Sequence, residues 1–328
     1  MNNDPILEVC NLKTQFLTYA GVVKAVDGVS FQLRRGETLS FVGESGSGKT
    51  ITNLSIIRLI PSPPGKIVGG EVRFMGEDVF AKSEKQMCQL RGHRISMIFQ
   101  DPMTCLNPLL RISSQMAETI NLHQGLGKKK AKEKLVEMLQ KVGISDPEKW
   151  MDAFPYQLSG GMRQRVMIAM ALSCNPEVLI ADEPTSALDV TIQAQILEII
   201  QELSVKMNTA VILITHDLGV VARMSDQVCV MYAGRMVEVA PVLALFENPQ
   251  HPYTKGLMKS VPRLDIADRE RLYSIRGSPP HLIGMPECCP FYPRCDSSAD
   301  ICRHEYPPET DLGDGHRVNC WRYGEEER

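Results

Sequence analysis

One short motif constrains this chain more than any other feature. After the apolar run of residues 38–42, the sequence continues Gly43-Glu44-Ser45-Gly46-Ser47-Gly48-Lys49-Thr50. A strand that leads into a glycine-rich loop and then a helix presents backbone N–H groups to an anion, at the positive end of the helix dipole. Lys49 is long enough to reach the β and γ phosphates of a nucleotide, and the hydroxyl of Thr50 is placed to coordinate Mg²⁺. The motif therefore predicts a nucleoside triphosphate site in an α/β domain.

Composition sets limits on the class of protein. The chain has 328 residues, of which 43% are hydrophobic and 23% charged, with a net charge of −3. These values are typical of a globular protein of about two domains, and they give no basic footprint for nucleic acid. The one lysine-rich stretch, residues 128–134, contains Glu133 and continues into a helical pattern, which predicts a solvated helix face.

Membrane segments are not expected. No apolar run approaches the roughly 18 residues that a membrane helix needs, and the N-terminus lacks the pattern of a signal peptide. The sequence therefore predicts a cytosolic protein that reaches a membrane only through partners.

The segments around the glycine-rich loop differ in periodicity. Residues 6–33 alternate between apolar and polar positions, which predicts an antiparallel sheet, and residues 101–162 follow a helical period. Phe16 and Tyr19 lie in the first of these segments. Either ring is a candidate for stacking on a nucleotide base, and each is equally typical of a half-buried strand aromatic.

Polar residues follow three apolar stretches that predict buried strands. These residues are Gln100, the pair Asp182 and Glu183, and His216. In α/β sheets, ligands bind at the carboxyl ends of the strands. Two adjacent carboxylates suit one Mg²⁺ ligand and one base for an attacking water, and His216 is a candidate contact for the γ-phosphate.

A second helix start has the features of an anion site. Ser159-Gly160-Gly161 precedes a helical stretch, so its backbone N–H groups are also available to a phosphate.

The ten cysteines fall into two groups. The first group is scattered among apolar neighbours and is predicted to be buried in the core: Cys10, Cys88, Cys105, Cys174 and Cys229. The second group crowds near the C-terminus: Cys288, Cys289, Cys295, Cys302 and Cys320. Four thiolates suit a [4Fe-4S] cluster or a tetrahedral zinc ion, whereas disulfides are disfavoured in the cytosol.

Together, the motifs resemble those of the ATPase subunits of ABC transporters over about residues 5–245. The matching segments are GESGSGKT, Gln100, LSGGM, VLIADE, SALD and His216. The resemblance implies a P-loop NTPase fold with a mixed or parallel core sheet, an antiparallel β subdomain and a helical insertion. It divides the chain into a nucleotide-binding core (1–100 and 163–245), a helical subdomain (101–162) and a cysteine-rich extension (246–328).

The resemblance also implies a role for each motif. Glu183 is the general base, Asp182, Gln100 and Thr50 serve Mg²⁺ and the attacking water, and His216 holds the γ-phosphate. Residues implied to contact ATP are Phe16, Gly43, Glu44, Ser45, Gly46, Ser47, Gly48, Lys49, Thr50, Ser159, Gly160, Gly161 and Asp189. Phe16 is preferred over Tyr19 as the stacking aromatic. Two such cassettes pair head to tail, so the helix that follows Ser159 closes over the nucleotide of the partner.

The extension narrows the resemblance to ATPase subunits of dipeptide and oligopeptide importers. It contains His251-Pro252-Tyr253 and then the cysteine group. In that subfamily the extension is associated with an iron–sulfur cluster, and Cys289, Cys295, Cys302 and Cys320 match its spacing, with Cys288 as a spare. Zinc and free thiols remain alternatives.

The implied function is the ATP-driven motor of a peptide importer. The implied partners are a second, related ATPase subunit, two transmembrane permease subunits and an extracellular solute-binding protein, with the chain peripheral on the cytoplasmic face of the membrane and no nucleic acid involved. The alternatives are an importer of another solute such as nickel, a soluble ABC ATPase acting on nucleic acid or ribosomes, and an inactive partner subunit, which the intact Glu183 and His216 oppose.

Overall fold

The computed structural model describes residues 4–186, 188–261 and 273–324. The chain divides into two compact units, one made of residues 1–6, 33–37 and 81–214, and the other of residues 7–32, 38–80 and 215–328. The first is called the helical unit below and the second the loop unit. Ala187 of the SALD motif lies outside the described residues.

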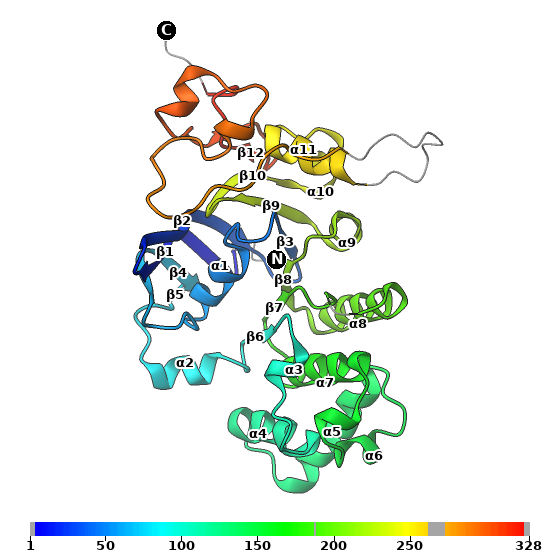
Figure 1. The fold of residues 1–328 in the computed structure, drawn as a ribbon. Helices are drawn as coiled ribbons and strands as arrows, with labels where there is room; N and C mark the ends of the chain where they lie inside the picture. The colour runs from blue at the N-terminus through cyan, green and yellow to red at the C-terminus, as the bar shows by residue number, and fades with distance from the viewer. Residues whose placement is uncertain (1–3, 187, 262–272, 325–328) are drawn as a thin grey trace, which may run out of the picture. The chain divides into compact units, whose positions relative to one another are not determined.

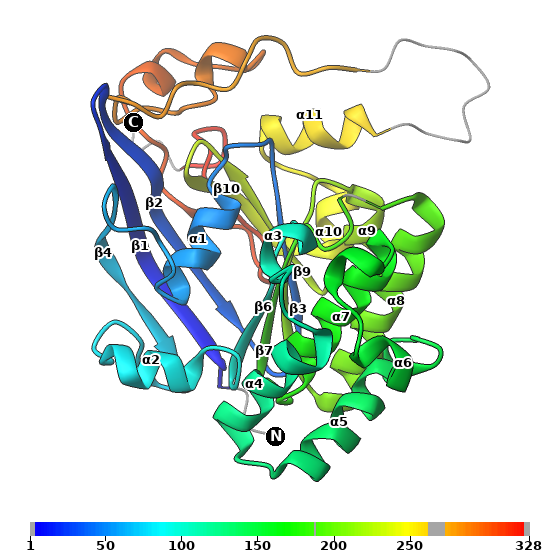
Figure 2. The same ribbon diagram turned by 60° about the horizontal axis from the view of Figure 1, so that its bottom comes forward.

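The loop unit contains an antiparallel sheet with strand order β2-β1-β4-β5. Its strands are β1 (Leu7–Thr18), β2 (Gly21–Leu33), β4 (Gly65–Phe74) and β5 (Glu77–Asp78). Figure 2 shows β1, β2 and β4 lying side by side. Side chains of β1 alternate between buried and less buried positions, as the period of a one-sided sheet requires. The predicted antiparallel subdomain is confirmed.

A second sheet in the loop unit has the order β11-β12-β10-β9-β3. Its strands are β3 (Thr38–Val42), β9 (Gln227–Tyr232), β10 (Arg235–Pro241), β11 (Thr310–Asp311) and β12 (Arg317–Val318). Strand β3 is parallel to β9, whereas β10 is antiparallel to both β9 and β12, so this sheet is mixed. Strand β12 comes from the end of the chain and pairs with β10 through Glu238 and Val318.

The helices of the loop unit are short. They are α1 (Lys49–Ile56), α9 (Leu218–Met224), α10 (Val242–Glu247) and α11 (Pro252–Ser260), with single 3₁₀ turns at Tyr292–Arg294 and Asp300–Arg303. Helix α1 ends at Ile56, and Arg58, two residues later, has a left-handed φ of 54° that a helix cannot continue through. A buried cluster that includes Tyr232, Tyr253 and Phe291 joins α11 and the first 3₁₀ turn to β9.

The helical unit contains three parallel strands in the order β8-β7-β6. They are β6 (Ile95–Ile98), β7 (Val178–Asp182) and β8 (Ala210–Ile214). Every residue of β7 and β8 is buried, which explains their continuous apolar sequences.

Helices make up the rest of this unit. They are α2 (Glu84–Leu90), α3 (Pro102–Cys105), α4 (Ile112–Gln124), α5 (Lys128–Lys141), α6 (Pro147–Met151), α7 (Gly160–Leu172) and α8 (Val190–Met207), with a 3₁₀ turn at Pro155–Gln157. Helices α4, α5 and α6 gather together (Figure 1). In α5, Ala131 and Leu135 are buried while Lys129, Lys130 and Lys132 are exposed, so the basic stretch is a solvated helix face as expected.

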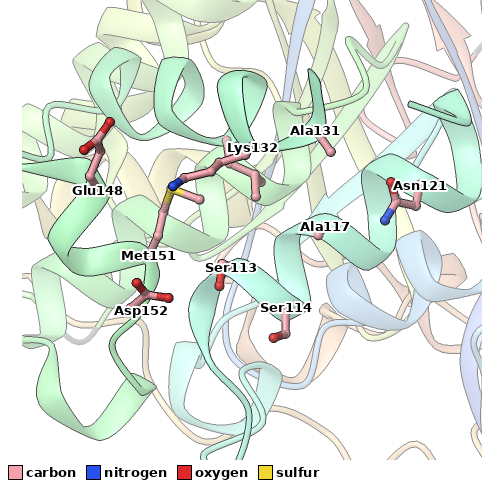
Figure 3. A pocket seen from close by; sticks show the side chains of 10 residues that line it. Ser113, Ser114, Ala117, Asn121, Ala131, Lys132, Glu148, Met151 and Asp152 are labelled. Atoms are coloured by element: carbon pink, nitrogen blue, oxygen red, sulfur yellow. The ribbon is translucent and has the colours of Figure 1, made fainter. Parts of the chain in front are cut away.

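A hollow of about 330 Å³ opens among α4, α5 and α6 (Figure 3). Polar side chains such as Ser113, Asn121, Lys132 and Glu148 line it beside Met151. Because charged groups border it, the hollow is a hydrated surface feature rather than a gap in a core. Across the described ranges, no helix combines the length and apolar character that crossing a bilayer requires.

The prediction for the scattered cysteines is wrong in part. Cys174 and Cys229 are buried, but Cys10, Cys88 and Cys105 are exposed. Apolar neighbours in sequence do not decide burial, because adjacent residues of a strand face opposite sides. Cys10 illustrates this, since it lies in β1 beside an irregularity in the pairing with β4.

Candidate functional site

The glycine-rich loop leaves the buried strand β3 and ends where α1 begins at Lys49. Gly43 and Gly48 have left-handed φ values of 149° and 104°. A Cβ on Gly43 would lie 2.2 Å from the carbonyl oxygen of Met231, and one on Gly48 would lie 2.4 Å from that of Ala25. The ends of the loop therefore admit only glycine, for reasons internal to this unit.

The crest of the loop is open. Ser45 and Gly46 are exposed, and nothing lies within 4 Å of a Cβ placed on Gly46, whereas Ser47 is buried and its N–H donates to the carbonyl of Glu44. Helix α1 has no side-chain cap at its N-terminus, where Thr50 is half-buried. An uncapped helix start behind an exposed glycine crest is suited to an anionic ligand.

Lys49 ties the two ends of the loop together. Its side chain is buried, and Nζ donates to the carbonyls of Gly43 at 2.7 Å and Glu44 at 3.0 Å and to Oγ of Ser47 at 3.3 Å. The ammonium group therefore lies inside the curve of the loop, where it adds positive charge to the dipole of α1.

The two candidate stacking aromatics differ in setting. Phe16 is half-buried in β1 opposite Gly65 of β4, and the ring fills the space where a Cβ on that glycine would lie. Tyr19 is fully exposed in the turn between β1 and β2. The preference for Phe16 stays a prediction.

In the helical unit, the structure brings Gln100 and Glu183 together. Strands β6 and β7 are parallel neighbours with Ile98 opposite Ala181, so both chain segments leave the sheet at the same edge. Nε2 of Gln100 donates to Oε2 of Glu183 at 2.7 Å. Asp182, the last residue of β7, directly precedes Glu183 and is buried.

Glu183 itself has an unusual backbone. Its φ is 43°, in the left-handed region that glutamate seldom adopts, and its N–H donates to the carbonyl of Ile214 at 2.9 Å. Residues held in this region cluster at functional sites, because the surrounding structure must over-determine them. The fixed backbone thus limits the directions in which the carboxylate of Glu183, the candidate base, can point.

Two further candidates of the helical unit begin helices. Oγ of Ser159 accepts from the N–H of Met162 and caps α7, and Oδ1 of Asp189 accepts from the N–H of Ile192 and caps α8. Ser159 and Gly160 are exposed, and the side chain of Leu188 lies 3.9 Å from a Cβ built on Gly160. The start of α7 and the turn before α8 are therefore neighbours within this unit.

His216 belongs to the loop unit and is exposed. It lies between Thr215, whose N–H donates to the carbonyl of Phe41, and Asp217, which caps α9. Its backbone is therefore fixed on both sides.

The four predicted ligand cysteines line one cavity of about 160 Å³, together with His251, Phe291 and Trp321. These cysteines are Cys289, Cys295, Cys302 and Cys320. Burial raises the pKa of Cys289 to about 12 and also raises the pKa of Cys295 and Cys320. Burial therefore favours the protonated thiol at Cys289, Cys295 and Cys320. Cys288 is buried but is absent from the lining, and its thiol lies near the carbonyl of Cys289.

No set of three or more His, Cys, Asp or Glu side chains within the described part of the chain is arranged to hold a metal ion. The described cysteines form no disulfide. The four thiols thus surround a space without converging on a single point.

Sequence reasoning missed two residues beside the loop. Arg294 of the first 3₁₀ turn and Tyr253 of α11 both contact Glu44. The only signal available was the segment His251-Pro252-Tyr253, which had no assigned chemistry. Long-range contacts of this kind leave no periodic pattern in a sequence.

Comparison with known proteins agrees with this geometry. Residues 26–186 match the family model described as ABC transporter, and residues 237–302 match the one described as oligopeptide/dipeptide transporter, C-terminal region. A solved structure of the ATP-binding cassette MJ0796, a dimer in a post-hydrolysis state with ADP and Pi, aligns with a TM-score of 0.65 at 25% identity, covering 72% of this chain and 98% of that one. The fold and the loop therefore define an ABC-type ATPase.

Similarity to curated proteins extends along nearly the whole chain. The dipeptide transport ATP-binding protein DppD of Bacillus subtilis is 52% identical, with 97% of this chain and 95% of that protein covered. The oligopeptide transport ATP-binding protein OppD of Salmonella typhimurium is 48% identical, with 98% and 95% covered. The chain belongs to the family of ATP-binding subunits of dipeptide and oligopeptide ABC importers.

Proposed function

We propose that this chain is the ATP-hydrolysing motor subunit of an ABC importer for dipeptides or oligopeptides. The observation that carries the proposal is the similarity to peptide-transport ATPases over 97% of the chain, which includes the C-terminal extension. The extension matters because the cassette is shared by ABC proteins of many functions. The proposal covers both dipeptides and longer peptides as cargo.

Binding of ATP is assigned to the loop unit. Lys49 and the N–H groups from Ser45 to Thr50 hold the β and γ phosphates, with Phe16 stacking on the base and His216 contacting the γ-phosphate. The buried ammonium group and the uncapped start of α1 support this assignment. Mg²⁺, when bound to the Thr50 hydroxyl and the Asp182 carboxylate, would neutralise charge that develops on the phosphates.

Hydrolysis is assigned to Glu183. Its carboxylate accepts a proton from the water that attacks the γ-phosphorus, the bond to the bridging oxygen breaks, and ADP leaves with that oxygen. Gln100 supports this role because its amide donates to the same carboxylate and holds it in one orientation. A glutamate with a fixed backbone and one fixed oxygen loses little freedom on reaching the transition state.

The proposed assembly is a pair of cassettes with two membrane permeases and an extracellular solute-binding protein. Ser159, Gly160 and Gly161 of one cassette cover the ATP of the other, which suits the exposure of Ser159 and Gly160 at the start of α7. The helical segment 101–162 passes the closing motion to the permeases. The chain itself then lies on the cytoplasmic face of the membrane, and its partner cassette is a related but distinct subunit.

We also propose a [4Fe-4S] cluster in the cysteine-lined cavity. A zinc site would draw its four sulfurs to about 2.3 Å from one point, whereas a cubane keeps its cysteines apart around its own volume. The proposal is supported by the four thiols that line one cavity and by their spacing along the chain, which lacks the C-x₂₋₄-C pairs typical of zinc ribbons. Because burial raises the pKa of Cys289, Cys295 and Cys320, metal binding would release protons from these thiols.

The motor function is tested in the reconstituted transporter with Glu183→Gln and, as a matched control, Glu198→Gln on the exposed surface of α8. We expect the first variant to lose at least about 100-fold in ATP turnover and in peptide uptake, and the control to match wild type. Unchanged turnover in Glu183→Gln would show that the base is misassigned. If the transporter takes up nickel and not peptides, the proposed cargo is wrong.

The cluster is tested on anaerobically purified protein by iron and acid-labile sulfide analysis. About four iron and four sulfide per chain are expected, lost in Cys295→Ser and retained in Cys288→Ser, because only the first thiol lines the cavity. One zinc per chain, or no metal, would reject the cluster and leave the ATPase assignment in place.

A further inference from the structure

Described residues of the C-terminal extension hold one residue of the glycine-rich loop, Glu44, through hydrogen bonds. The guanidinium of Arg294 forms two hydrogen bonds to its carboxylate, from Nη1 to Oε2 at 2.7 Å and from Nη2 to Oε1 at 2.9 Å. The N–H of Glu44 donates to the hydroxyl of Tyr253 at 2.8 Å. Both the side chain and the backbone of one loop residue are therefore held by the extension.

The arginine is firmly placed. Its side chain is only 5% exposed, and its remaining N–H groups donate to the carbonyl of Arg276 at 2.8 Å, the hydroxyl of Tyr232 at 3.2 Å and the carbonyl of Ile275 at 3.4 Å. A bidentate pair at such low exposure is far stronger than a surface ion pair. The guanidinium is thus surrounded by hydrogen-bond acceptors, two of which are carbonyl oxygens of the extension.

The tyrosine is equally constrained. Its ring is fully buried and packs on Tyr232 at 4.6 Å and Phe291 at 5.4 Å between ring centroids. The preceding turn is fixed because Nδ1 of His251 accepts from the N–H of Tyr253. The segment His251-Pro252-Tyr253 therefore serves to aim one hydroxyl at the loop.

Glu44 lies where its charge matters. The same residue accepts from Nζ of Lys49 through its carbonyl, so it is part of the curve that surrounds the lysine. A carboxylate in a loop that binds phosphates repels the ligand unless a cation compensates it. Arg294 is the group that provides this compensation in the structure.

We propose that Arg294 is a positioning residue for nucleotide binding: it holds and neutralises Glu44, with Tyr253 fixing the backbone, so that the extension sets the affinity of the loop for ATP. This inference rests on the proposed role of the loop in binding phosphates. Deleting or disturbing the extension would then weaken ATP binding through Glu44.

The test is the dissociation constant of the full-length chain for Mg²⁺ and a non-hydrolysable ATP analogue, measured by calorimetry. We expect Arg294→Gln to bind about tenfold more weakly, since a hydrogen-bonded charge pair is lost and a carboxylate is left uncompensated. The double variant Arg294→Gln with Glu44→Gln is expected to bind more tightly than the single Arg294→Gln variant, because the repelling charge is gone. Arg317→Gln, which breaks an exposed ion pair with Glu309 in the same extension, is the matched control.

Three further readouts separate this mechanism from a loss of folding. The defect of Arg294→Gln should shrink as salt is raised, because screening weakens the repulsion. Arg294→Lys, which keeps the charge but not the bidentate geometry, should lie between wild type and Arg294→Gln. Urea unfolding and metal content are compared for every variant.

Two outcomes would overturn the inference: wild-type affinity in Arg294→Gln, or a double variant as weak as the single one. Lys49→Ala distinguishes the failure of the proposed function. If Lys49→Ala keeps full affinity, the loop is not the phosphate site at all, whereas if Lys49→Ala loses binding and Arg294→Gln does not, only the role of Arg294 is wrong.

Discussion

Two helix starts of this protein are assigned to ATP, and they are built in opposite ways. Helix α1 begins without a side-chain cap, behind glycines that the fold itself demands, since a Cβ on Gly48 would meet the carbonyl oxygen of Ala25 at 2.4 Å. Helix α7 begins with a serine cap, and the first of its two glycines, Gly160, is tolerated rather than demanded by this chain, whereas a Cβ on Gly161 would lie 3.1 Å from Cγ2 of Ile192. A Cβ on Gly160 would find only Leu188, at an ordinary contact distance of 3.9 Å.

The difference separates two reasons for the same residue. The glycines at the ends of the loop keep the backbone of one chain from colliding with itself. Gly160 has no such reason within the described residues around it, and it is exposed. A glycine that its own chain does not need is explained by something that approaches from outside, which in the proposed assembly is the ATP held by the partner cassette.

The largest effect is expected for Gly48→Ala. A left-handed alanine costs about 1–2 kcal/mol, and the collision with the carbonyl of Ala25 adds to it, so we expect a loss of more than about 2 kcal/mol in the free energy of unfolding. Nucleotide binding should be lost as well. Urea denaturation and calorimetry with Mg²⁺ and ADP measure both. Gly46→Ala, at the open crest, is the control and should destabilise less, because only its left-handed φ of 77° opposes the substitution.

The next effect concerns Gly160→Ala and should appear only in the assembled transporter. In the isolated chain, the free energy of unfolding of the variant should lie within about 0.5 kcal/mol of wild type or slightly above it. Alanine is the better helix former, and its Cβ meets nothing closer than 3.9 Å. In the assembled pair, a methyl group that holds two reacting partners about 1 Å too far apart should lower ATP turnover by about 100-fold. Equal loss of stability in the isolated chain would erase the contrast between the two helix starts.

Candidate site residues could be proposed from the sequence, whereas most of the contacts around them could not. The loop, the strand ends and the start of α7 carry local motifs, because each depends on neighbours within a few positions. Gln100 and Glu183 were each expected at the carboxyl end of a strand, but the hydrogen bond between them was not predicted. The contact of Arg294 with Glu44 spans 250 positions and has no local signature.

The burial predicted for three of the scattered cysteines was also wrong. The exposed Cys10, Cys88 and Cys105 had been expected in the core, because their neighbours in sequence are apolar. For Cys10 the face depends on strand register, and β1 has two register irregularities between Cys10 and Thr14, whereas Cys88 and Cys105 lie in the helices α2 and α3. The four C-terminal cysteines that were expected to act together do line one cavity, although up to 17 other residues separate them along the chain.

The smallest effect is expected for the cap of α7. Ser159→Ala removes the acceptor for the N–H of Met162 and should lower the free energy of unfolding by about 1 kcal/mol, whereas Ser159→Thr, which keeps an acceptor, should lie closer to wild type. If the serine only caps the helix, ATP turnover of the assembled transporter should follow the same order and fall little. If its hydroxyl also reaches the nucleotide of the partner cassette, turnover of Ser159→Ala should fall by tenfold or more while stability still changes by only about 1 kcal/mol. Urea unfolding of the isolated chain and turnover of the pair, measured on the same two variants, therefore decide whether the start of α7 binds phosphate through its backbone alone.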